Sequence, residues 1–191
     1  NIYHQYVLEQ QKTVDEVDTL FYWKQQLAHT NALDMMVKAS KISTHRINNS
    51  LLIGAEHSQS LKTFCRQLKI PPSVYFKAIY AFILQRYCQP DGDFFITEVL
   101  SSRQKQHYKA FGCYYQQVPM VFNADDFRPQ QTIQSYLLKV KQQIRQLGHF
   151  KNISQSQLQQ FLPESRLSFL YNFYNFPKQV DFLAQKTSIQ Q

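Results

Sequence analysis

The hydrophobic and polar positions follow two different periods along the chain, and these periods predict an order of helices and strands. In residues 14–28 and 130–147, apolar residues recur every three or four positions, which indicates amphipathic helices. Residues 71–88 begin with two prolines and are then apolar on nearly every side, as is typical of a helix buried between layers. Residues 94–100 are apolar with little alternation, which predicts a strand buried on both faces.

Weaker patterns complete the order of elements. Residues 48–57 resemble a strand, and residues 58–69 predict a helix capped by a serine. Residues 114–122 predict a strand in which Pro119 indicates a bulge or a sheet edge. The further expected elements are a turn at 90–93, a polar basic loop at 101–110, a short helix at 154–161 and a strand at 166–176. This order predicts an α/β fold in which a mixed sheet is layered with helices.

The helical periods also predict which side chains are buried. In the first helix, the expected inner face holds Val17, Leu20, Phe21 and Leu27. In the helix at 130–147 the apolar stripe consists of Ile133, Leu137, Val140, Ile144 and Leu147. Lys139, Lys141 and Arg145 lie off this stripe, and a solvated helix face explains them more simply than a binding patch does.

Composition restricts the class of protein. A chain of 191 residues with 43% hydrophobic residues can bury a core, and its length suits one domain or one lobe of a larger domain. The net charge of +8 and the pI near 9.4 predict an anionic partner: an acidic protein, a phosphate-bearing small molecule or nucleic acid. Because the sequence has no dense run of Lys and Arg, nucleic acid is not expected.

The cysteines and the apolar runs predict the cellular location of the protein. Cys65, Cys88 and Cys113 are an odd number at wide spacing, which favours reduced thiols in a cytoplasmic protein. No stretch is typical of a signal peptide, and no apolar run is long enough to span a bilayer, so a membrane partner is not expected.

Several segments in a fixed order resemble the condensation domains of nonribosomal peptide synthetases. "YHQYVLEQ…FYWKQQL" is similar to the segment that joins the two lobes of such domains. Arg86-Tyr87, Asp93 and Ser101-Ser102-Arg103 follow at similar spacing to the family pattern. The stretch 112–119 resembles the family's Gly-x-Phe-Val-Asn-Thr-x-Pro, with Gln116 and Gln117 in place of Asn and Thr. Later matches are weaker. Only the histidine of the family's His-Gln-Asp motif is present, as His149, and the resemblance extends to residue 176.

The resemblance implies a fold like chloramphenicol acetyltransferase, in which two lobes form a V around a tunnel. The chain, residues 1–191, would be most of the second lobe, with a connector and helix at 1–28 and a sheet with helices at 29–191. The family's HHxxxDG motif belongs to the first lobe, and no His-His pair occurs in this sequence. The isolated chain is therefore expected to lack a catalytic residue and to be inactive.

The resemblance also implies which residues would meet a substrate. Gly112 would permit a turn or the close approach of a substrate arm. Along the following strand, Tyr114 and Gln116 are expected to point one way, and Cys113, Tyr115 and Gln117 the other. In the last strand Tyr171, Phe173 and Asn175 would share one face, and Asn172, Tyr174 and Phe176 the other; both faces could equally be core. The expected substrate-binding residues are Ser101, Arg103, Gly112, Tyr114, Gln116, Gln117, Asn172 and Tyr174.

The sequence leaves different functions open. The chain would contribute to amide bond formation between an acyl or peptidyl thioester and an amine, both carried on phosphopantetheine arms of acidic carrier proteins. No metal or directly bound cofactor is expected. The alternatives are a non-catalytic, condensation-like interaction module of a synthetase, and one lobe of a coenzyme A-dependent acyltransferase. The sequence does not identify the substrates, the product, or whether the domain condenses, epimerises or cyclises.

Overall fold

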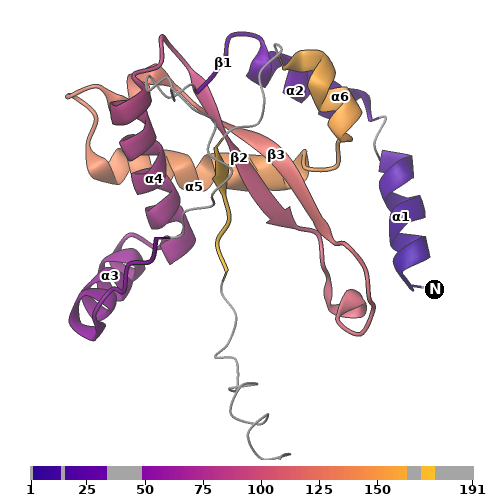
Figure 1. Ribbon diagram of the computed structural model, residues 1–191, viewed down its shortest axis with the longest axis horizontal. Coiled ribbons are helices and arrows are strands. Elements are labelled where there is room, and N and C mark those ends of the chain that lie inside the picture. The colour runs from indigo at the N-terminus through magenta and orange to yellow at the C-terminus, as the bar shows by residue number, and fades with distance from the viewer. Residues whose placement is uncertain (1, 14–15, 34–48, 163–168, 175–191) are drawn as a thin grey trace, which may run out of the picture.

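A computed structural model describes residues 2–13, 16–33, 49–162 and 169–174 of the chain (Figure 1). Its α-helices are α1 (Ile2–Thr13), α2 (Val17–Leu27), α3 (Ala55–Gln67), α4 (Pro72–Cys88), α5 (Ile133–His149) and α6 (Gln155–Phe161). Its strands are β1 (Asn31–Ala32), β2 (Phe94–Ser101), β3 (Tyr115–Phe122) and β4 (Leu170–Tyr171). Two 3-10 helices, η1 (Lys105–His107) and η2 (Ala124–Phe127), lie in loops.

The sheet is mixed and is built around β2. β3 runs antiparallel to β2 along its whole length, and β1 and β4 run parallel to β2. Because β3 occupies one edge of β2, β1 and β4 share the other edge, β1 at Phe94 and Phe95 and β4 at Thr97 and Glu98. The first five residues of β2 are buried, which confirms the strand expected at 94–100.

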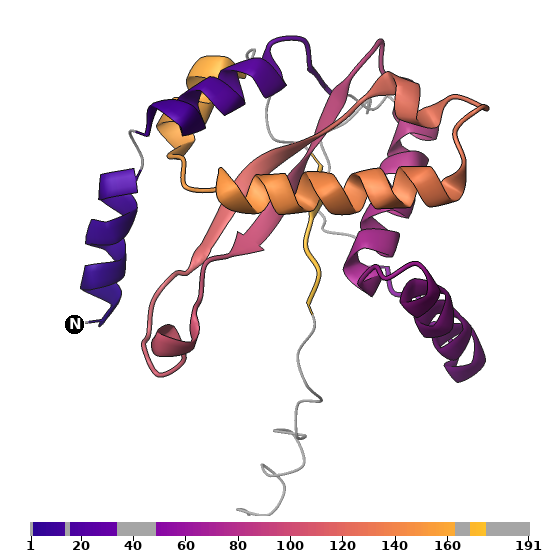
Figure 2. The same cartoon turned by 180° about the vertical axis from the view of Figure 1, so that it is seen from behind.

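Helices cover the sheet and close the core. α5 crosses β2 and β3 on the face turned to the viewer in Figure 2, and α4 packs against α5. The hydroxyl of Tyr136 in α5 donates to the carbonyl of Ala78 in α4 (3.1 Å). This arrangement confirms the predicted α/β class, a mixed sheet layered with helices. In the part of the chain that the structure describes, no helix combines the length and the apolar character that crossing a bilayer requires.

Helix α2 turns a different face inward from the one predicted. Its buried residues are Thr19, Trp23 and Leu27, whereas Val17 and Phe21 are 78% and 60% exposed. The expectation is therefore correct for Leu27 and wrong for Val17 and Phe21.

Contacts with the end of α5 determine this rotation of α2. The indole N–H of Trp23 donates to the carbonyl of Phe150 (2.8 Å), and the ring of Tyr22 stacks on that of Phe150 at 4.1 Å. An indole N–H needs an acceptor when it is buried, so this bond favours the orientation in which Trp23 points inward.

The prediction of a strand at 48–57 is wrong. Residues 49–54 form no strand, and residues from Ala55 onward belong to α3, whose N-cap is Gly54 and not the predicted serine; Asn48 lies outside the described residues. Leu51 and Leu52 are each more than 90% exposed. An isolated apolar run becomes a strand only where a neighbouring strand accepts its hydrogen bonds, and the described residues place none there.

Helix α4 spans 72–88 as expected, but it is not buried all round. Val74, Ala78 and Ala81 face the core, whereas Ile79, Phe82 and Ile83 are 37–44% exposed. The helix lies beside the sheet and not between two layers (Figure 1), so one of its sides has no layer to cover it.

The proline in β3 occupies a position that needs no N–H. The backbone N–H of Thr97 donates to Phe169 and so turns away from β3. Pro119 pairs with Thr97, so the pair is a non-hydrogen-bonded one and the ladder loses no bond. Pro119 thus lies at the outer edge of the described sheet, one of the two positions that the sequence predicted.

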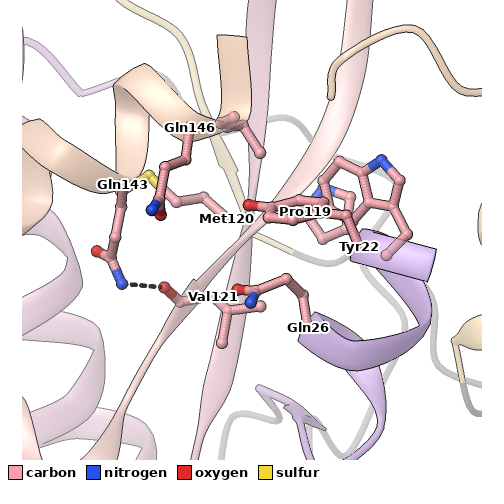
Figure 3. A pocket seen from close by; sticks show the side chains of 9 residues that line it. Tyr22, Gln26, Pro119, Met120, Val121, Gln143 and Gln146 are labelled. Carbon is pink, nitrogen blue, oxygen red and sulfur yellow. Dashed lines mark hydrogen bonds between the residues drawn. The ribbon is translucent and has the colours of Figure 1, made fainter. Parts of the chain in front are cut away.

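Glutamine side chains cover this outer edge. The amide of Gln143 donates to the carbonyl of Val121 (3.2 Å; Figure 3), and that of Gln155 donates to the carbonyl of Gln117 (2.7 Å). A cavity of about 10 Å³, the size of one water molecule, lies there between α2, β3 and α5. These glutamine side chains therefore bind backbone carbonyls that an exposed strand edge would otherwise offer to another strand.

Two of the three lysine and arginine side chains off the α5 stripe hold the fold together. Lys139 pairs with Asp126 in η2, and Lys141 donates to the carbonyl of Lys69. Arg145 is exposed. The solvated helix face predicted for these residues is therefore found at Arg145, whereas Lys139 and Lys141 are partly buried and bind their neighbours. The stripe itself is confirmed at Leu137, Val140 and Leu147 and is wrong for Ile133, which is 74% exposed.

Candidate functional site

An open pocket of about 760 Å³ lies where the β2–β3 hairpin meets residues 170–174. From the hairpin it is lined by Val99, Ser101, Arg103, Gly112, Cys113, Tyr114, Tyr115 and Gln117. From the last described segment it is lined by Leu170, Asn172, Phe173 and Tyr174. Seven of the eight residues expected to bind substrate line this pocket, and Gln116 is the exception.

The hairpin loop at the rim of the pocket is organised around Arg103. The guanidinium donates to the carbonyls of His107 (2.6 Å), Ala110 (3.0 Å) and Gly112 (3.3 Å), and it lies 4.3 Å from the ring centroid of Tyr114. These three hydrogen bonds close the loop upon itself. Arg103 therefore shapes the pocket wall, and much of its donor capacity is already used by the protein.

A buried aromatic cluster joins this loop to helix α1. Tyr114 stacks on His107 at 4.8 Å and packs against Tyr6 at 4.7 Å and Tyr3 at 5.3 Å. Burial raises the pKa of Tyr6. His107 is buried, and its Nδ1 accepts the backbone N–H of Gln104 (3.1 Å), so this histidine has a structural role.

Gly112 and Gln116 also contact α1, which the sequence did not predict. Gly112 adopts φ +150°, and a Cβ there would overlap the ring of Tyr3, so the close neighbour of this glycine is Tyr3. The amide of Gln116 donates to the side-chain oxygen of Gln10 (2.8 Å). The binding roles expected of both residues remain predictions. The expected alternation is seen in the contacts with α1, which Tyr114 and Gln116 make. Cys113, Tyr115 and Gln117 line the pocket, and Tyr114 borders it as well.

Helix α4 holds the opposite wall of the pocket. The strand β4 is only two residues long, but the hydroxyl of Tyr171 donates to the carbonyl of Ser73 (3.0 Å), and Phe173 stacks on Phe76 at 6.3 Å. On the face of this segment turned away from α4, the amide of Asn172 donates to the hydroxyl of Tyr174 (2.6 Å). The predicted alternation is thus confirmed for residues 171–174, while Asn175 and Phe176 lie outside the described residues.

A buried ion pair lies beside Tyr171 and so contacts the segment that forms this wall. Lys77 of α4 lies 2.7 Å from Glu98 of β2, both side chains are almost fully buried, and the ammonium lies 5.2 Å from the ring centroid of Tyr171. Burial lowers the pKa of Lys77 and raises the pKa of Glu98, since low polarity disfavours each charged form. Burial, with a smaller contribution from the Glu98 charge, also raises the pKa of Tyr171. The pair had no signal in the sequence beyond a lysine and a glutamate within two apolar elements.

The chemistry of the pocket is that of binding and orientation. Within the described ranges, no group of three or more His, Cys, Asp and Glu side chains could hold a metal ion. The described lining offers amides, phenols, one thiol and one guanidinium, and it includes no histidine, aspartate or glutamate. Such a wall can orient a polar chain among rings, but it offers no histidine or carboxylate to act as a base.

Replacing Gly112 with alanine is expected to destabilise the protein by about 1–3 kcal/mol from backbone strain alone, and further through the clash with Tyr3. Urea denaturation should show part of this cost recovered when the same change is made in a Tyr3→Ala background. Gly148→Ala is the matched control, because nothing lies within 4 Å of its added Cβ and helix α5 should gain about 0.5–1 kcal/mol. An equal cost of Gly112→Ala with and without the Tyr3 ring would contradict the close packing.

Comparisons with known proteins place this arrangement among solved folds. No protein-family description and no curated protein matches the sequence. Similar solved structures include the condensation domain from Monacolin K polyketide synthase MokA (TM-score 0.65, 15% identity, 82% of this chain and 38% of that chain). The X-domain from teicoplanin biosynthesis is similar over 84% of this chain and 36% of that chain (TM-score 0.64, 17% identity).

A four-domain nonribosomal peptide synthetase bound to AMP and glycine is similar to the same extent (TM-score 0.65, 18% identity), over 82% of this chain and 12% of that chain. The chain thus spans less than two fifths of each of these three proteins. The structural match nevertheless covers more than four fifths of this chain in each case, so the chain has the α/β fold of condensation domains.

Proposed function

We propose that the chain is the second lobe of a condensation domain and that it helps to join an acyl or peptidyl thioester to an amine. The observation that carries this proposal is the gathering of residues 101, 103, 112, 114, 117, 172 and 174 around one pocket. These residues come from two distant parts of the sequence, the β2–β3 hairpin and residues 172–174, and the resemblance to condensation domains indicates each of them as a substrate contact. The condensation-domain fold supports the same proposal.

In the proposed reaction, the amine nitrogen attacks the thioester carbonyl, a C–N bond forms, the C–S bond breaks, and the thiol leaves as the amine loses a proton. The chain's own part is to position the reactants, because amides and phenols can hold an amide-bearing chain beside the reacting atoms. The group that orients or deprotonates the amine would come from a first lobe that carries HHxxxDG. The phosphopantetheine arms of acidic carrier proteins would deliver both reactants, and the net charge of +8 suits such partners.

The test is a reconstituted assay with two carrier proteins, one loaded with an acyl thioester and the other with an aminoacyl thioester. Mass spectrometry of the carrier-bound product should detect an amide when the chain is joined to a first lobe with an intact HHxxxDG, and none for the 191-residue chain alone. A heat-treated sample is the control. Amide formation by the chain alone would contradict the assignment as a second lobe, and so would its absence from every two-lobed combination.

A second candidate function is a non-catalytic, condensation-like module that binds other parts of a synthetase. The contacts of α1 favour it, because Tyr3 fills the space beside Gly112 and Gln10 binds the amide of Gln116. These two positions were the most specific part of the resemblance, and in this structure protein groups contact both. The same assay separates the two candidates, since only the catalytic lobe yields an amide.

A further inference from the structure

Among the described residues that line the 760 Å³ pocket, the one charged side chain is positive. The polar side chains that line it in the described part of the chain are neutral, apart from the guanidinium of Arg103. No aspartate or glutamate lies among these lining residues. A cation that enters the pocket therefore meets no carboxylate on these walls.

The charge of Arg103 has no counter-ion in the described structure. The ion pairs there join Lys77 to Glu98, Arg128 to Asp125, and Lys139 to Asp126, and none includes Arg103. Its guanidinium binds three backbone carbonyls, which supply dipoles but no negative charge. The positive charge at the rim is therefore only partly compensated.

A second cation lies at the same end of the pocket. The ammonium of Lys151, in the connection between α5 and α6, donates to the carbonyl of Ser101 (3.2 Å). The hydroxyl of Ser101 in turn accepts the backbone N–H of Arg103 (3.2 Å). Two positive charges thus flank Ser101, which lines the pocket.

Such an arrangement discriminates by charge. A unit charge about 10 Å from another, at an effective dielectric constant of about 20, changes an affinity by roughly tenfold. The exposed rings of Tyr115, Phe173 and Tyr174 give the same pocket apolar surface. Rings and amides together suit an amide-bearing chain with an apolar or aromatic group.

We propose that this pocket binds uncharged or anionic amide-bearing chains with an apolar or aromatic group and rejects chains that carry an ammonium. This proposal rests on the proposed function. In the proposed reaction, it means that the acceptor amine enters the pocket as the free base. The free base is the form whose lone pair can attack a thioester.

Cys113 provides the measurement. It lines the pocket and is exposed, whereas Cys65 and Cys88 are buried, so a thiol reagent should label Cys113 first. The rate of labelling by a maleimide is measured by mass spectrometry in the presence of three probes that share the phenylalanine side chain and differ in charge. The probes are N-acetylphenylalanine amide, which is neutral, N-acetylphenylalanine, which is anionic, and protonated phenylalanine amide, which is cationic. Cys113→Ser confirms the labelled position.

The neutral and anionic probes are expected to slow labelling at concentrations about tenfold lower than the cationic probe, and added salt should narrow this difference. Lys151→Met should reduce the difference about threefold. Lys109→Met is the control, because it removes the same charge from an exposed position of the hairpin loop, whereas Lys151 donates to Ser101 of the pocket wall.

Equal or stronger protection by the cationic probe would overturn the proposal and would indicate that the tyrosine rings bind cations instead. Absence of protection by all three probes would also overturn it. An unchanged difference in Lys151→Met would contradict the charge assigned to that residue. If the neutral and anionic probes protect Cys113 better but two-lobed proteins form no amide, the proposed function fails and the charge selectivity stands. If the cationic probe protects better and two-lobed proteins form an amide, the charge selectivity fails and the proposed function stands.

Discussion

Replacing Lys77 with methionine is expected to lower the free energy of unfolding by about 3–5 kcal/mol, because the change leaves the Glu98 carboxylate buried without its partner. Glu98→Gln should have a similar effect, since it leaves the ammonium of Lys77 unpaired. Burial already disfavours both charges, as the lowered pKa of Lys77 and the raised pKa of Glu98 indicate. Urea denaturation followed by circular dichroism measures the loss.

The double variant Lys77→Met/Glu98→Leu tests the cause of this loss. Both charges are then absent, and apolar groups of similar volume fill the space, so stability should return to within about 1 kcal/mol of the parent or exceed it. The exposed pair of Arg128 and Asp125 is the control, and Arg128→Met should cost less than about 1 kcal/mol. Additive losses in the double variant would contradict the account, because they would mean that each residue stabilises the protein independently of the other.

Replacing Trp23 with alanine is expected to cost about 3–5 kcal/mol. The indole is fully buried in the core, and its removal leaves a cavity and frees the carbonyl of Phe150. Trp23→Phe should cost less, because it keeps most of the apolar volume and loses only the hydrogen bond. Thermal and urea denaturation of the three proteins give the comparison.

Phe21→Ala is the matched control for Trp23→Ala, because it removes another aromatic ring from the same helix. Phe21 is 60% exposed, so its removal should change stability by no more than about 0.5 kcal/mol. The two variants therefore distinguish the observed rotation of α2 from the one that the apolar spacing predicted. A larger loss for Phe21→Ala than for Trp23→Ala would show that the helix turns its other face to the core.

The two walls of the pocket are joined through Tyr171. Its hydroxyl bonds to Ser73 of α4, and its ring lies beside the ammonium of Lys77, whose partner Glu98 belongs to β2. The position of residues 172–174 thus depends on a buried ion pair outside the pocket. The loss of stability in Lys77→Met should therefore be accompanied by faster labelling of Cys113 even where the protein remains folded.

The sequence by itself determined the elements whose signal is local. The proline start and length of α4 and the unbroken apolar run of β2 depend on neighbouring residues, and both elements lie where their patterns predicted. The alternation along β3 is equally local, and it correctly separated Tyr114 and Gln116 from Tyr115 and Gln117. The resemblance to condensation domains selected seven of the residues that line one pocket.

Only the tertiary structure decided which faces are buried and which partners meet. The apolar spacing of α2 predicted that Phe21 faces inward, but Trp23 does so instead, and it donates to the carbonyl of Phe150, which lies 127 residues away in the sequence. Leu51 and Leu52 had the composition of a strand, but a strand also needs a neighbour to accept its hydrogen bonds. Likewise, the contacts of Gly112 with Tyr3 and of Gln116 with Gln10 arise because α1 lies beside the hairpin, and no pattern near residues 112–116 indicated them. The period of a single segment predicts which residues share a face, but the partner that covers this face, and so the residues that end up buried, depends on contacts between distant residues.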